Sequence, residues 1–314
     1  MTGRLQKWIT RLALAVPLLA LILFTAEIGA RTFICPRHQA EFSPFPLDHR
    51  NNPELYAPDP DLFWTMRPNQ SEGINRFGLR GELPDEPKQR FRILCLGGSI
   101  TYGFHLTTEQ ALPARLGAAL GPGVETINAG VNGYTIVQGE RWFARDLATL
   151  RPDLLIADFG YNDAMQGTVP DLAQPRAPNV AWRFHRRWGR FCLARLLISP
   201  WTVEPQFGVT RVAPDDYRDT CRKLAQDAHD AGARTVFLLL DEYNLAEDAF
   251  FSRRYKPPAG LPVVDLTRAF DGLEMTQVKS FYMDGMHMSA DGIERIAAYL
   301  ADELRRRKMV DLGR

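Results

Sequence analysis

Five short apolar runs punctuate the chain from residue 89 onwards. They cover residues 92–96, 124–127, 154–159, 235–240 and 263–266, and polar residues rarely interrupt them. A nearly continuous apolar run is typical of a parallel strand that helices cover on both faces, whereas a half-buried strand alternates. Since helical patterns separate the runs, the sequence predicts right-handed βαβ units and a three-layer α/β/α sandwich around a five-stranded, mainly parallel sheet.

Three helical segments, two between the runs and one after the last run, have an apolar face and recognisable ends. A capping box begins the first, over residues 135–150, and the second, over residues 217–232, ends on a glycine. The last helix begins near Ser289 and ends in the basic residues 305–308, which complement the helix dipole. Each repeats its apolar residues at steps of three and four, as expected for a helix packed on a sheet.

The beginning of the chain, residues 1–31, has the pattern of a membrane anchor. No charged residue occurs from Leu12 to Ala26, and only Glu27 interrupts the apolar stretch before Ala30. This length spans the hydrocarbon core of a bilayer, at the short end of the range. Basic residues precede it at positions 4, 7 and 11, which favours a cytoplasmic N-terminus. The sequence therefore predicts a membrane-anchored protein, with a transmembrane helix through residues 12–30 and the rest of the chain extracytoplasmic, either periplasmic or extracellular.

A cleaved signal peptide is the alternative interpretation of the same segment. Cleavage after Ala30 would put Ile28 at the minus-three position, where a small residue is preferred. That poor fit favours the uncleaved anchor. Both interpretations send the bulk of the chain across the membrane.

The rest of the chain divides into an arm and a main domain. Residues 32–88 are rich in proline, which prevents a long helix and predicts turns and short strands packed on the main domain. The main domain, residues 89–314, carries an insertion at 164–214. Within the insertion, residues 182–191 are aromatic and basic, which fits a helix on the membrane surface, a lid, or a solvated face with a core-packing stripe.

The balance of basic and acidic residues and the spacing of the cysteines exclude several classes of function. The 38 Lys and Arg nearly balance the 37 Asp and Glu, so no nucleic-acid-binding surface is expected. The four cysteines are scattered without zinc-ligand spacing, which excludes a typical zinc site. Cys95 lies inside an apolar run and is expected to be a buried thiol. A Cys35–Cys192 disulfide is possible in an oxidising compartment.

Chemically useful side chains follow the ends of the predicted strands. Ser99 comes after the first run and two glycines, and a glycine-containing turn at residues 128–135 follows the second. Asn162 follows the third run, and the pair Asp284 and His287 precedes the last helix. Carboxyl ends of parallel strands meet at one edge of the sheet, so these residues are expected to converge. A serine becomes nucleophilic when a histidine takes its proton, and a carboxylate commonly orients that histidine.

These segments resemble the four conserved blocks of the SGNH/GDSL hydrolase family, in the family's order. The blocks are residues 97–101, Gly133 within residues 128–135, residues 160–163 and residues 284–287. The resemblance extends over roughly residues 90–305 and implies a flavodoxin-like SGNH hydrolase fold. One departure is Gly98, where the commonest family form has Asp before the serine.

The resemblance also implies a role for each site residue. Ser99 is expected to be the nucleophile, His287 the general base, and Asp284 the residue that orients His287 in a catalytic triad. The backbone N–H groups of Ser99 and Gly133, with the side-chain amide of Asn162, are expected to form the oxyanion hole.

The predicted function is that of a serine esterase that hydrolyses acyl or acetyl esters of a cell-envelope carbohydrate or lipid through an acyl-enzyme. No cofactor and no metal are expected. An O-acyltransferase with the same triad is the first alternative, since a sugar hydroxyl in place of water changes only the second step. A catalytically idle envelope-binding protein is the second, and the intact triad residues argue against it.

Overall fold

A single parallel sheet forms the centre of the protein. The computed structural model describes residues 2–33, 54–167, 169–173, 187–188, 191–197, 208–240, 242–244, 249–251 and 255–310. The sheet has the order β11-β8-β5-β3-β4, and every neighbouring pair is parallel. Its strands are β3 (Phe91–Gly97), β4 (Val124–Gly130), β5 (Leu154–Asp158), β8 (Arg234–Leu239) and β11 (Val263–Asp265). All five predicted strands are therefore confirmed.

The strand order determines where a site can form. Counted along the chain, the five strands of the sheet lie in the flavodoxin-like order 2-1-3-4-5. The connections therefore leave β3 and β5 in opposite directions, which opens a crevice outside the carboxyl ends of these two strands. Ser99 follows β3 and Asn162 follows β5, so both belong to this crevice.

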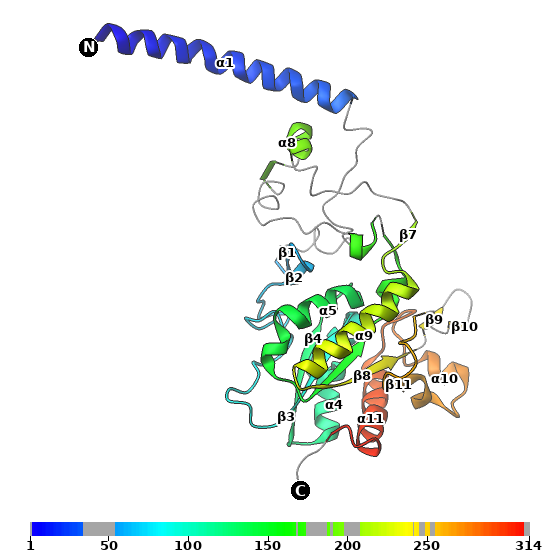
Figure 1. Cartoon of the computed structure of the whole chain (residues 1–314). Coiled ribbons are helices and arrows are strands. Elements are labelled where there is room, and N and C mark those ends of the chain that lie inside the picture. Colours follow the sequence, from blue (N-terminus) through cyan, green and yellow to red (C-terminus); the bar gives the residue numbers. More distant parts are fainter. Residues whose placement is uncertain are drawn as a thin grey trace.

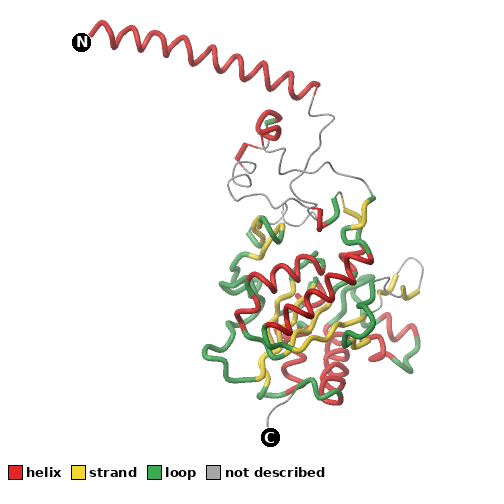
Figure 2. Tube along the Cα trace, viewed as in Figure 1, coloured by secondary structure: helices red, strands yellow, loops and turns green. Residues whose placement is uncertain are grey.

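Helices cover both faces of the sheet, which confirms the three-layer prediction. Figures 1 and 2 show α5 (Ile136–Arg145) and α9 (Pro214–Asp230) crossing one face. The other face packs against α4 (Leu112–Leu120) and α11 (Ala290–Arg306). Each layer has a continuous apolar core, with Phe143 and Leu224 in the first and Leu116 and Ile296 in the second.

The predicted helix ends agree with the structure, with one exception. The backbone N–H of Thr135 donates to the Gln138 side chain at 3.1 Å, and Ser289 accepts from the backbone N–H of Gly292 at 3.3 Å. The exception is the first helix, which ends at Arg145 and continues as a 3-10 turn over Leu147–Leu150. The apolar side chains at 147 and 150 still pack on the core, because the tighter turn keeps them on the same side.

Short elements connect these layers. They comprise α3 (Ser99–Tyr102), α6 (Tyr161–Ala164), α8 (Cys192–Leu197), α10 (Met275–Lys279), the strand pairs β1 (Tyr56–Asp59) with β2 (Phe63–Met66), β6 (Gln166–Gly167) with β7 (Val209–Thr210) and β9 (Glu242–Asn244) with β10 (Ala249–Phe251), and 3-10 turns at Thr108–Gln110, Asp171–Ala173 and Leu266–Phe270.

Residues 54–90, called the N-terminal segment below, pack against the sheet domain. The Trp64 ring meets the Tyr134 ring edge-on at 5.5 Å, and the Tyr134 hydroxyl donates to the Trp64 carbonyl at 2.6 Å. At the edge of the sheet, the Arg80 N–H donates to the Asn128 carbonyl of β4 at 3.0 Å. These contacts bring the N-terminal segment next to the turn that follows β4.

The N-terminal helix α1 (Thr2–Phe33) extends away from the sheet in Figure 1, beside α8. Its segment Arg11–Phe33 is long and apolar enough to cross a membrane, with a mean hydropathy of 2.2, although a signal sequence would meet the same criteria. The Glu27 carboxylate accepts the backbone N–H groups of Cys192 at 2.8 Å and Leu193 at 3.0 Å. The one charge in the apolar stretch thus bonds to the first turn of α8.

The insertion and the cysteines are described only in part. Residues 182–186 and 189–190 of the aromatic, basic segment lie outside the described residues, and so does Cys35. Cys192 is disulfide-bonded, whereas Cys95 and Cys221 are free thiols. Burial raises the pKa of the Cys95 thiol far above its usual range, as expected for a thiol that serves only for packing.

Candidate active site

Ser99 lies at the start of α3, directly after β3 and Gly98. The turn is tight because two backbones meet there: a Cβ atom at Gly130, the last residue of β4, would overlap the backbone nitrogen of Tyr102 in α3. Only glycine permits this approach. The end of β4 therefore holds the short helix that carries Ser99 beside the turn that follows β4.

Three side chains form a continuous hydrogen-bonded relay. The Ser99 Oγ lies 2.9 Å from His287 Nε2, and His287 Nδ1 lies 2.6 Å from Asp284 Oδ2. Only 12% of the His287 side chain is exposed, whereas Asp284 is 43% exposed. The structure brings together residues 188 positions apart in the chain, as expected from the strand-end argument.

The tight loop at residues 284–287 gives each carboxylate oxygen of Asp284 its own hydrogen-bond donors. Its Oδ1 accepts the backbone N–H groups of Met286 at 2.8 Å and His287 at 2.6 Å, which leaves Oδ2 for the imidazole. Burial raises the pKa of this carboxyl, but the hydrogen bonds from His287 and Met286 outweigh it and lower the pKa below its ordinary value. The carboxylate therefore stays ionised at neutral pH.

Two of the predicted oxyanion-hole donors, the backbone N–H groups of Ser99 and Gly133, lie in the turns that follow β3 and β4. Gly133 has a φ of +81°, a left-handed conformation that favours glycine, and lies in the turn after β4. Among the described residues, no acceptor pairs with the backbone N–H of Ser99 or of Gly133. Unpaired N–H groups beside a nucleophile are suited to stabilise negative charge on a substrate oxygen.

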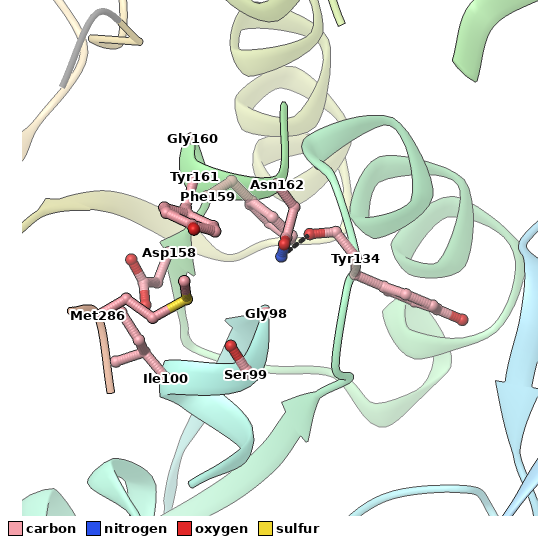
Figure 3. A pocket seen from close by; sticks show the side chains of 10 residues that line it. All are labelled: Gly98, Ser99, Ile100, Tyr134, Asp158, Phe159, Gly160, Tyr161, Asn162 and Met286. Carbon is pink, nitrogen blue, oxygen red and sulfur yellow. Dashed lines mark hydrogen bonds between the residues drawn. The ribbon is translucent and has the colours of Figure 1, made fainter. Parts of the chain in front are cut away.

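Asn162 lies across a small cavity from Ser99, as Figure 3 shows. Its Nδ2 donates one hydrogen to the Tyr134 carbonyl at 3.0 Å, which leaves the second hydrogen of the amide. The neighbouring Asp163 accepts the backbone N–H groups of Ile136 at 2.9 Å and Gly160 at 2.8 Å. Asp163 thus ties the loop after β5 to the start of α5. Burial raises the pKa of Asp163 to about 7, against the lowering effect of these hydrogen bonds.

Sequence reasoning missed a buried ion pair behind the Gly133 turn. Arg211 Nη1 donates to the Gly133 carbonyl at 2.7 Å, and Arg211 Nη2 donates to Asp171 at 2.9 Å and Gln138 at 2.9 Å. Both members of the pair come from the insertion, where no motif marks them. Only the requirement that a buried charge be paired could have suggested that they meet.

A second omission is the loop after α3. Phe104 and His105 received no role from the sequence, yet their ring centroids lie 4.8 Å and 6.1 Å from that of His287. His105 has a φ of +64°, which is uncommon outside glycine. The loop therefore forms one wall beside the histidine of the relay.

A model of the GDSL-like Lipase/Acylhydrolase family matches residues 95–295, about two thirds of the chain. The chain belongs to this family. The match includes Ser99, Gly133, Asn162, Asp284 and His287, and it starts after the N-terminal segment that packs on the sheet. The prediction of an SGNH/GDSL serine hydrolase is confirmed, because lipases and acylhydrolases are enzymes that hydrolyse esters.

Individual proteins resemble this chain either over only part of their length or at low sequence identity. An arylesterase of Vibrio mimicus is 32% identical over 84 residues, which are 26% of this chain and 42% of the arylesterase. The alignment thus spans less than half the length of that relative. Among solved structures, a putative lipolytic protein of the G-D-S-L family from Desulfitobacterium hafniense has a TM-score of 0.44 at 14% identity, over 68% of this chain and 99% of that one. An aryl esterase of M. smegmatis has a TM-score of 0.42 at 16% identity, over 68% and 98%.

Proposed function

We propose that this protein is a membrane-anchored, extracytoplasmic serine esterase that removes short acyl groups from a component of the cell envelope. The observation that carries the proposal is the relay from Ser99 Oγ through His287 to Asp284, with distances of 2.9 Å and 2.6 Å. A hydroxyl, an imidazole and a carboxylate at these distances match the arrangement required for nucleophilic catalysis by serine.

The reaction has two steps on these residues. His287 Nε2 takes the Ser99 proton while Oγ attacks the ester carbonyl, and the resulting imidazolium returns the proton to the leaving alcohol. Water then attacks the acyl-enzyme, His287 takes its proton, and Ser99 Oγ leaves with the proton from His287. In both steps the developing oxyanion accepts hydrogen bonds from the N–H groups of Ser99 and Gly133 and from Asn162 Nδ2.

The space beside Ser99 favours a short acyl group. The cavity lined by Ser99, Asn162 and Met286 has a volume of about 20 Å³, little more than one water molecule requires. A long acyl chain would need a continuous apolar channel there. We therefore infer that acetyl or another short acyl group is transferred to Ser99.

A covalent inhibitor tests the proposed nucleophile. A fluorophosphonate is expected to attach one phosphonyl group to the wild-type protein, because Ser99 Oγ displaces fluoride at phosphorus with the help of His287. Intact-mass spectrometry should record a single adduct, and peptide mapping should assign it to Ser99. The Ser99→Ala variant, which keeps the fold, is expected to remain unlabelled. Equal labelling of both proteins would exclude Ser99 as the nucleophile.

The proposed location of the active site outside the cytoplasm rests on the apolar N-terminal helix and on a disulfide bond. Basic residues at positions 4 and 7 precede the apolar segment Arg11–Phe33, whose first residue is also basic. Cys192 is disulfide-bonded, which is typical of proteins outside the reducing cytosol. We infer that α1 stays in the membrane and the sheet domain faces the cell envelope, so that the substrate is an envelope component.

Protease treatment of spheroplasts tests this topology. When the full chain is expressed in a bacterial host, external protease is expected to degrade the sheet domain while a cytoplasmic marker protein survives. The membrane fraction of untreated cells should contain the full-length chain, because no residues are lost when the anchor is not cleaved. A sheet domain protected in intact spheroplasts and digested only after lysis contradicts the proposed orientation.

A further inference from the structure

The turn that follows β4 carries the predicted oxyanion donor Gly133 and lies against the end of β3. The backbone N–H of Tyr134 donates to the Val131 carbonyl at 3.1 Å, which closes the turn. The backbone N–H of Val131 donates to the Gly97 carbonyl at 3.0 Å, close to Ser99 in the chain. The position of this turn therefore decides where the Gly133 N–H lies relative to Ser99.

A buried arginine, Arg211, binds this turn from behind. Its Nη1 donates to the Gly133 carbonyl at 2.7 Å, and its Nη2 donates to the Gln138 side chain at 2.9 Å. Gln138 caps the start of α5, since its Oε1 accepts the backbone N–H of Thr135 at 3.1 Å. Hydrogen bonds from a charged donor are stronger than those between neutral groups. The guanidinium therefore fixes the Gly133 carbonyl relative to the first turn of α5.

Asp171 holds the guanidinium of Arg211 in one orientation. Its Oδ1 accepts from Arg211 Nε at 3.2 Å, and its Oδ2 accepts from Arg211 Nη2 at 2.9 Å and from the Thr135 hydroxyl at 2.7 Å. Asp171 is fully buried, and Arg211 is only 4% exposed. A planar fork that a carboxylate binds at two points has a fixed direction. The remaining nitrogen, Nη1, is thereby held against the Gly133 carbonyl.

The segment that carries Arg211 also binds the loop of Asn162. The backbone N–H of Val212 donates to the Asp163 carbonyl at 3.1 Å, and the backbone N–H of Arg211 donates to the Met165 carbonyl at 2.9 Å. Both loops that carry predicted oxyanion donors are therefore attached to the same short segment, one through the Arg211 side chain and the other through the backbone.

We propose that Arg211, held by Asp171, is a positioning residue that keeps the Gly133 N–H where the oxyanion forms. The proposal rests on the esterase function proposed above, because the oxyanion exists only while an ester or an acyl-enzyme reacts. A donor is effective at about 2.7–3.1 Å from the oxyanion, and a misplacement of about 1 Å can lower the rate about 100-fold. A buried ion pair often adds no stability over apolar residues of the same volume, so its contribution is expected in this orientation.

The substitution Arg211→Lys keeps the positive charge beside Asp171 and removes the planar fork. A lysine ammonium is a point charge and cannot bind Asp171 and the Gly133 carbonyl in the geometry of the guanidinium. In the full-length protein in detergent, kcat for p-nitrophenyl acetate is expected to fall about 30-fold, because the displaced donor acts in the transition state. KM is expected to stay within about threefold of wild type, since substrate binding is not affected.

A ketone that forms a stable oxyanion gives a second measurement. Trifluoroacetophenone is expected to add reversibly to Ser99: Oγ bonds to the ketone carbon, His287 takes the hydroxyl proton, and the ketone oxygen becomes an oxyanion. That oxygen accepts from the same N–H groups as the oxyanion of the ester reaction. The dissociation constant of the ketone, measured by inhibition, is therefore expected to rise about 30-fold in Arg211→Lys, in parallel with the loss in kcat.

The matched control is Arg92→Lys, because Arg92 is also a buried arginine that pairs with a carboxylate and donates to backbone carbonyls. Its Nε lies 2.5 Å from Glu125 Oε2, and its two other nitrogens donate to the carbonyls of Leu150 and Asp85. Arg92 lies near the start of β3, whereas Ser99 follows the end of that strand. The control is expected to lower Tm and to leave kcat and the ketone's dissociation constant within about twofold of wild type.

A second variant, Asp171→Asn, removes the charge that holds Arg211 and allows the measurement if Arg211→Lys does not fold. It is expected to lower kcat about tenfold at unchanged KM and to weaken ketone binding equally. Equal kcat values for Arg211→Lys and Arg92→Lys, or a lowered kcat with unchanged ketone affinity, overturn the positioning role while ester cleavage itself stands. A wild-type protein that neither cleaves p-nitrophenyl acetate nor binds the ketone overturns the esterase function instead.

Discussion

Replacing either Ser99 or His287 by alanine is expected to lower kcat for p-nitrophenyl acetate by about a million-fold, and replacing both is expected to lower it no further. The 2.9 Å contact between Ser99 Oγ and His287 Nε2 makes the two side chains one proton-transfer unit. Without the imidazole the hydroxyl is a poor nucleophile at neutral pH, and without the hydroxyl the imidazole has nothing to activate. The residual rate then comes from the oxyanion donors and from substrate binding.

Steady-state kinetics on the purified full-length protein measure this non-additivity. The control is His229→Ala, because His229 is 82% exposed at the end of α9 and is expected to leave kcat within twofold of wild type. If the double variant were slower than either single variant by a further factor of 1,000 or so, the two residues would act independently, and the relay would have to be abandoned.

Much of this site follows from local sequence because its residues belong either to a strand end or to one short loop. The turn after β3 carries Ser99 and the turn after β5 carries Asn162, and the crevice between these strands is a property of the strand order. The loop of Asp284 and His287 is equally local, since its hydrogen bonds span at most three residues. Short-range geometry of this kind is encoded by the residues that adopt it.

The parts that the sequence did not predict depend on distant partners. Arg211 supports Gly133 from 78 positions away, and no local pattern distinguishes it from a surface arginine. The same holds for Arg80, whose guanidinium bonds to carbonyls 22 to 26 residues away. The prolines predicted that residues 32–88 would form turns and short strands, but not that Trp64 would pack on Tyr134 or that Arg80 would bond to the loop after α3. Such contacts depend on how loops meet, which residue spacing does not record.

Replacing Asp284 by asparagine is expected to lower kcat by about 10,000-fold, as the corresponding change does in serine proteases. The loop geometry gives the reason. Two backbone N–H groups, from Met286 and His287, bind Oδ1 and would hold the amide oxygen of asparagine at that position. The amide NH₂ would then face His287 Nδ1 and force the tautomer that carries its proton on Nε2. That imidazole cannot accept the proton of Ser99.

The pH dependence of the Asp284→Asn variant shows whether Asp284 orients His287 over the whole range in which the wild-type carboxylate is ionised. Hydrogen bonds from His287 and Met286 outweigh burial and lower the pKa of Asp284 below 3.8, so the wild-type carboxylate loses its charge only in strong acid. The defect of Asp284→Asn is therefore expected to exceed tenfold at every pH from about 5 to about 9, in kcat measured with p-nitrophenyl acetate. Asp230→Asn is the matched control, because it changes an exposed Asp beside His229, and it should match wild type. A loss under tenfold at all pH values would show that Asp284 does not orient the base.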